Sequence, residues 1–157
     1  MGGDKHSYEG PVSTPTVDLT TAKIHWNRVL YIPYGKYLII DVKNFYLNNT
    51  MKKAEYIKID LKITPQEIID KYNLLNKKCD GYIYVIIEKG IYDLLQAGII
   101  AHESLKENLQ PYGYAPGKIT QGIWTNTERD INFTPVADDF GIKYRNKKDA
   151  EHLISAL

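Results

Sequence analysis

Three aspartates follow or interrupt apolar segments, where a carboxylate needs a physical explanation. Asp41 ends the apolar run of residues 37–40, and Asp138 and Asp139 stand side by side within residues 133–144. A charge at the end of a buried strand costs free energy unless it is paired or bound to a cation. Carboxylates on adjacent strand ends can share two divalent cations, which activate a hydroxyl nucleophile and stabilise the leaving group of an in-line displacement. The three residues are therefore candidates for metal-assisted phosphoryl transfer.

The run before Asp41 is short and β-branched, which predicts a central strand buried on both faces. The alternative for Asp41 is a helix N-cap, since residues 42–47 could begin a helical turn. The choice between these two interpretations stays open on local grounds.

A β-hairpin is predicted over residues 133–144, with Asp138 and Asp139 as its two loop residues. That register makes three alternate cross-strand pairs apolar: Ala137 with Phe140, Pro135 with Ile142, and Phe133 with Tyr144. The intervening positions are mostly polar, so the hairpin would have one buried and one wetter face. Two aspartates are an unusual choice for a tight turn, which needs positive φ, although Asp tolerates the left-handed region better than most residues. The alternative is an ordinary hairpin with a solvated acidic tip.

The rest of the pattern predicts alternating strands and helices, an α+β chain. Strands are expected over residues 56–61, 82–87 and 122–125. Helices are expected after the N-cap Asp18, after a capping box at residues 64–67, over residues 94–109 and after Asn146. In the helix over residues 94–109, Ala97 and Gly98 would let another backbone or a flat ligand approach closely.

Composition limits the class of protein. The 157 residues suit one domain, and an apolar fraction of 43% with a charged fraction of 25% is typical of a globular chain. The single cysteine, Cys79, excludes an internal disulfide and a multi-cysteine zinc site. No apolar run is long enough to span a bilayer and no signal peptide is visible, so we expect an intracellular protein that is not secreted, cytoplasmic or within a virus-like particle.

Two catalytic motifs fail on spacing. His102-Glu103 begins a zinc-protease pattern, but Lys106 stands where the second histidine must fall. Gly117-Lys118 begins a phosphate loop, but Ile119 stands where Ser or Thr must bind magnesium.

Three segments carry a family resemblance. Residues 41–47, Asp-Val-Lys-Asn-Phe-Tyr-Leu, resemble the first palm motif of reverse transcriptases. Residues 92–98, Tyr-Asp-Leu-Leu-Gln-Ala-Gly, resemble their Leu-Pro-Gln-Gly motif, and residues 136–139, Val-Ala-Asp-Asp, are similar to their Tyr-x-Asp-Asp box. Order and spacing agree, and residues 15–23 resemble the segment ahead of the palm in copia-type retrotransposon polyproteins. The chain thus resembles the reverse transcriptase of a copia-like LTR retrotransposon over nearly its whole length.

This resemblance implies a fold of the polymerase palm type. The expected architecture is an antiparallel sheet packed on helices, with part of the fingers and no thumb. Residues 1–157 would form a single fragment, with a lead-in and packing helix over residues 1–35 and the palm over residues 36–157.

The resemblance also implies an RNA-directed DNA polymerase and a role for each motif. Asp41, Asp138 and the backbone carbonyl of Val42 would hold two Mg²⁺ or Mn²⁺ ions, with Asp139 as a supporting catalytic acid. The partners would be an RNA or DNA template with its primer and deoxynucleoside triphosphates, without a membrane. The implied nucleotide-binding residues are Asn44 and Phe45 at the triphosphate, Tyr46 under the sugar to exclude a 2′-hydroxyl, and Gln96, Ala97 and Gly98 along the template and nucleotide pocket.

The chain departs from the family pattern at several positions. Leu95 replaces proline, Asp93 replaces glycine and Ala137 replaces a bulkier apolar residue, while Pro135 lies inside a hairpin strand. Pro135 and Ala137, in the third motif, favour an alternative, a decayed and catalytically inert retrotransposon remnant. A second alternative is a non-catalytic nucleic-acid binding module that uses some of the thirteen tyrosines and the lysine clusters.

Overall fold

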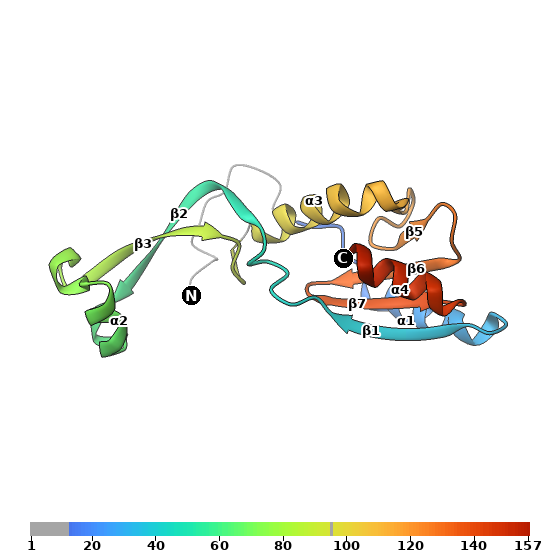
Figure 1. Ribbon diagram of the computed structural model, residues 1–157, viewed down its shortest axis with the longest axis horizontal. Coiled ribbons are helices and arrows are strands. Elements are labelled where there is room, and N and C mark those ends of the chain that lie inside the picture. The colour runs from blue at the N-terminus through green and yellow to red at the C-terminus, as the bar shows by residue number, and fades with distance from the viewer. Residues whose placement is uncertain (1–12, 95) are drawn as a thin grey trace. The chain divides into compact units, whose positions relative to one another are not determined.

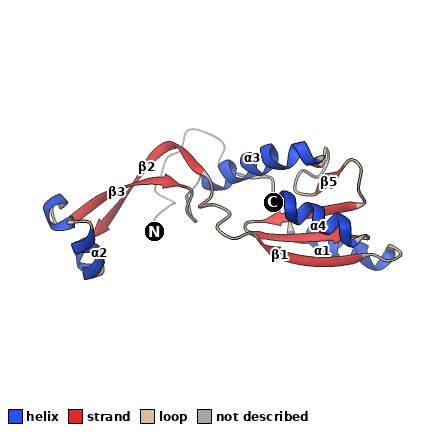
Figure 2. Ribbon diagram, in the orientation of Figure 1, coloured by secondary structure: helices blue, strands red, loops and turns tan. Residues whose placement is uncertain are grey.

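The computed structural model describes residues 13–94 and 96–157 (Figure 1). Within them the chain forms two antiparallel sheets and four α-helices, which confirms the predicted α+β class (Figure 2). The contacts divide the chain into two compact units, Met1–Asn49 with Gly90–Leu157, and Thr50–Lys89. We name them the sheet unit and the arm unit. In the part of the chain that the structure describes, no helix is long and apolar enough to cross a membrane.

The sheet unit is built on five antiparallel strands in the order β1-β7-β6-β5-β4. Their bounds are β1 Lys36–Asp41, β4 Tyr114–Pro116, β5 Trp124–Asn126, β6 Ile131–Val136 and β7 Asp139–Tyr144. Successive side chains of a strand point to opposite faces, so this sheet presents two surfaces to be covered.

Helices α3, Ala97–Leu109, and α4, Lys147–Ala156, cover one face of this sheet. The predicted N-cap of the last helix is confirmed, because the Asn146 side chain accepts a hydrogen bond from the Lys148 N–H. The core between helices and sheet is aromatic and aliphatic: Leu105, Leu109, Tyr114, Trp124, Ile131, Phe133, Phe140, Ile142 and Leu153.

Helix α1, Leu19–Asn27, lies against the other face. Asp18 caps it as predicted, accepting hydrogen bonds from the backbone of Thr20 and Thr21. His25 is fully buried, and its Nε2 lies 3.3 Å from Oδ1 of Asn132 on β6.

The hairpin forms, but the predicted register is wrong by two residues. Val136 pairs with Asp139, so the loop residues are Ala137 and Asp138, and Phe133 faces Ile142 instead of Tyr144. Ala137 has φ 54°, in the left-handed region. The reason is that a slip of two residues keeps every side chain on its face, so both registers bury the same apolar set.

Strand β1 ends at Asp41 as predicted, but its predicted central position is wrong. It is an edge strand among the described residues, pairing only with β7, and Ile39 is 62% exposed. Residues 43–48 form turns and not a helix, so the N-cap alternative for Asp41 is not observed.

The arm unit consists of the long hairpin of β2, Thr50–Asp60, and β3, Tyr82–Lys89, with the short helix α2, Gln66–Lys71, between them. The predicted capping box is not formed, because the Thr64 hydroxyl donates to the Asp60 carbonyl. The hydrophobic core of the arm unit is small, with Ile69, Leu74 and Ile83 buried.

Candidate functional site

The acidic end of β1 lies against the acidic tip of the β6–β7 hairpin. Asp41 is the cross-strand partner of Asp139, and the Val42 N–H donates to the Asp138 carbonyl at 2.8 Å. The sheet thus brings all three sequence-predicted acids to one end of its strands, where β1 ends and β7 begins. Asp139, and not Asp138, is the residue directly opposite Asp41.

None of these three carboxylates makes an ion pair with a described lysine or arginine. Asp41 and Asp139 are exposed and Asp138 is half-buried. Like charges directly opposite in an antiparallel pair are destabilising. A bound cation would relieve this repulsion.

Asp138 accepts a hydrogen bond from the Tyr92 hydroxyl, with 2.5 Å between Oη and Oδ2. This bond and the nearby Asp138 and Asp41 charges raise the pKa of Tyr92 to about 12. Burial and the Asp138 charge also raise the pKa of Tyr46. The two phenols therefore stay protonated beside the carboxylates.

The two predicted triphosphate-binding residues lie in the turn after β1. The Phe45 N–H already donates to the Val42 carbonyl at 3.1 Å, and Asn49 Nδ2 donates to the Phe45 carbonyl at 2.6 Å. Asn44 has φ 59°, a left-handed conformation that Asn tolerates. The turn is held internally, and the Phe45 N–H would have to leave Val42 to meet a phosphate.

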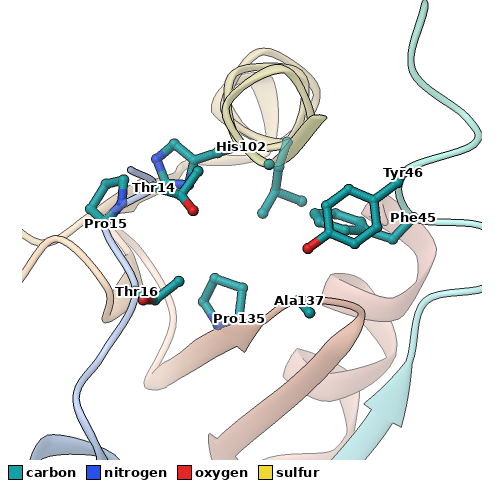
Figure 3. A pocket seen from close by; sticks show the side chains of 10 residues that line it. Thr14, Pro15, Thr16, Phe45, Tyr46, His102, Pro135 and Ala137 are labelled. Carbon is teal, nitrogen blue, oxygen red and sulfur yellow. The ribbon is translucent and has the colours of Figure 1, made fainter. Parts of the chain in front are cut away.

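A pocket of about 40 Å³ lies beside Tyr46 (Figure 3). Ala137 and Pro135 of the hairpin line it, as do Gly98 and His102 of α3. Residues 14–16 close another side (Figure 3). This volume suits a water-sized group, since ligand pockets usually measure about 300–1,000 Å³.

The other two predicted pocket residues do not line this pocket. Gln96 and Ala97 are both buried in the protein. A Cβ placed on Gly90 would lie 3.5 Å from that of Ala97, so the small side chain at position 97 serves close packing. Only Gly98 of this predicted trio borders the pocket.

Asp139 borders a different cavity, on the face that α1 covers. This cavity measures about 470 Å³, and Trp26, Tyr37 and Thr134 are among its lining residues. Asp138 and Asp139 thus differ in surroundings although they are adjacent in the chain.

The donor set fits divalent cations only in part. Among the described residues, no group of three or more His, Cys, Asp and Glu side chains is arranged to hold a metal ion. Mg²⁺ commonly binds through one or two carboxylates together with substrate phosphates. Asp41 and Asp138 offer two carboxylates on segments that the bond from the Val42 N–H to the Asp138 carbonyl joins, and the Val42 carbonyl keeps a second lone pair beside its bond to Phe45.

Scans against family models, curated proteins and solved structures find no match to this chain. The residues and their arrangement are therefore the basis on which a function can be proposed. No sequence pattern indicates the Tyr92–Asp138 hydrogen bond, which joins residues 46 positions apart.

Proposed function

We propose that this chain is a reverse transcriptase palm fragment, an RNA-directed DNA polymerase that transfers a nucleotide to a primer 3′-hydroxyl. The observation that carries the proposal is the register of β1 against β7, which sets Asp41 opposite Asp139 and bonds Val42 to Asp138. The order of the three sequence motifs adds support.

Each residue then has a defined task. Asp41 and Asp138 would hold the cations, and bound Mg²⁺ or Mn²⁺ would supply charge stabilisation and activation of the hydroxyl. The Tyr46 ring lies edge-on to Phe45, with ring centroids 5.4 Å apart, and borders the pocket beside the hairpin. The family resemblance gives Tyr46 the task of excluding a 2′-hydroxyl from the incoming sugar.

Extension of a DNA primer on an RNA template, with deoxynucleoside triphosphates and Mn²⁺, tests the proposal. We expect Asp41→Asn and Asp138→Asn each to reduce extension at least about 100-fold, because charge stabilisation in the transition state is lost. Glu107→Gln, an exposed change on α3, is the control and should match the parent.

An Asp138→Asn variant that extends as well as the parent would contradict the proposed site. A parent that extends no primer would instead favour the inert remnant, which Ala137 and Pro135 first suggested. Pro135 itself is compatible with the sheet, since β5 pairs with β6 only at Asn132 and Phe133.

The arm unit favours a second candidate function, binding of single-stranded nucleic acid. Tyr56 and Tyr84 are each 61% exposed, and Lys58 is the cross-strand partner of Tyr84. Lys58 Nζ also lies 3.9 Å from the ring centroid of Tyr82. Exposed aromatic rings beside cations are the ordinary platform for stacking bases. Binding of single-stranded DNA that weakens steeply with salt and needs no divalent cation would favour this candidate.

A further inference from the structure

Tyr92 joins the acidic tip to the turn after β1. Its hydroxyl bonds Asp138, and its ring meets the Tyr46 ring edge-on with centroids 4.9 Å apart. Tyr92 precedes α3 in the chain and touches neither strand of the hairpin through its backbone hydrogen bonds. Its contact with Asp138 is therefore made by the side chain.

Aromatic contacts hold the Tyr92 ring in place. Tyr46 packs on Phe45, and Phe45 packs on Phe140 with ring centroids 5.6 Å apart. Phe140 has no exposed surface and belongs to the main core. A continuous set of rings thus connects the Tyr92 hydroxyl to the buried core of the sheet unit.

The hydrogen bond leaves Asp138 able to bind a cation. A carboxylate has two oxygens and about four acceptor sites, and the phenol uses one site on Oδ2. Because the donor is neutral, the negative charge stays available. A lysine at the same place would neutralise that charge and repel a cation.

We propose that Tyr92 is a positioning residue, whose hydroxyl fixes the Asp138 carboxylate in the orientation that receives a divalent cation. This inference rests on the proposed function, because it assumes that Asp138 is a ligand. Groups that orient metal ligands through hydrogen bonds typically account for 10- to 100-fold in metal affinity.

Tyr92→Phe tests this role, since it removes the hydroxyl and keeps the ring. Tyr72→Phe is a matched control, because Tyr72 and Tyr92 are each 52% exposed. The readout is Mn²⁺ affinity, measured from the electron paramagnetic resonance signal of free Mn²⁺. We expect Tyr92→Phe to weaken binding about tenfold, the lower end of the usual range because Tyr92 is half exposed. Tyr72→Phe should equal the parent.

The outcomes separate the two proposals. If Asp138→Asn abolishes Mn²⁺ binding and Tyr92→Phe leaves it unchanged, the positioning role is overturned and the metal site stands. If the parent binds no Mn²⁺ through Asp138, both proposals fall. Thermal unfolding of Tyr92→Phe completes the test. Weaker Mn²⁺ binding with an unchanged unfolding midpoint supports the positioning role. A lowered unfolding midpoint that accounts for the weaker Mn²⁺ binding overturns it.

Discussion

The sheet unit and the arm unit differ in how much apolar surface each buries. Trp124, Phe133 and Phe140 have no exposed surface in the sheet unit. In the arm unit, Ile83 is the most buried apolar side chain of the small core, at 4% exposed. Buried apolar area is the main favourable term in folding. The candidate acids are therefore fixed to the well-packed unit, and the exposed tyrosines of the second candidate function lie on the weaker one.

The largest expected effect comes from opening the core of the sheet unit. Phe133→Ala should lower the free energy of unfolding by about 3–5 kcal/mol, because it removes a fully buried ring and leaves a cavity. Urea denaturation measures the change. A loss below 1 kcal/mol would show that Phe133 is not in a packed core.

Ile83→Ala is the comparison variant in the arm unit. We expect a loss of about 2 kcal/mol, the lower end for such truncations, because few neighbours surround this side chain. Amide hydrogen exchange should show lost protection confined to β2 and β3. Equal loss of protection in β6 and β7 would contradict the division into two units.

A smaller effect is expected at the buried charge of the sheet unit. Lys143 is 2% exposed, and its Nζ lies 3.1 Å from Oδ1 of Asp130, which also pairs with Arg145. Asp130→Asn should cost about 1–2 kcal/mol, because it leaves a buried cation with a weaker partner, while the half-exposed Asp130 moderates the loss.

Glu151→Gln is the matched control for that variant. It breaks the exposed pair of Lys147 and Glu151 and should change stability by less than about 0.5 kcal/mol. Equal losses in the two variants, measured by urea denaturation, would show that the burial of Lys143 adds nothing.

The last expected difference between the two units is in how their stability changes with pH. Burial lowers the pKa of His25 and of His102 below the usual 6.5, helped by the nearby Lys143 and Lys106 cations. Below pH 6.5 the unfolded chain therefore binds protons that the folded chain does not, so stability falls as the pH drops. The arm unit contains no histidine.

Hydrogen exchange between pH 7 and 5, corrected for intrinsic rates, checks this difference. Protection in β6 and β7 should decrease more than protection in β2 and β3. A variant with both His25→Asn and His102→Asn should remove most of that decrease. An unchanged pH response in this variant would contradict the assignment.

The sequence predicts elements better than it predicts their contacts. Asp18 and Asn146 cap helices as expected, because a cap depends on residues within one turn. The hairpin register was missed, because a two-residue slip preserves the faces and the turn falls on Ala137, a residue with no preference for positive φ. The central position predicted for β1 was wrong, because an apolar run does not show which neighbours cover it.

The candidate site could be predicted only in part, because some of its contacts depend on the packing of distant segments. The end of β1 and the acidic tip follow from local pattern, and the sheet brings them together. The contact between Tyr92 and Asp138 depends on how distant segments pack, and no spacing rule indicates it. The same holds for the burial of Gln96 and Ala97, which no helix pattern indicates. Ala97 packs close to Gly90, a contact between residues of different segments.

The most direct test of the proposed metal site is anomalous X-ray scattering at the manganese edge, from crystals grown with Mn²⁺ and a deoxynucleoside triphosphate. We expect a manganese peak within coordination distance, about 2.1 Å for Mg²⁺-type sites, of carboxylate oxygens from both Asp41 and Asp138. A structure with the nucleotide bound and no manganese at these two residues would contradict it.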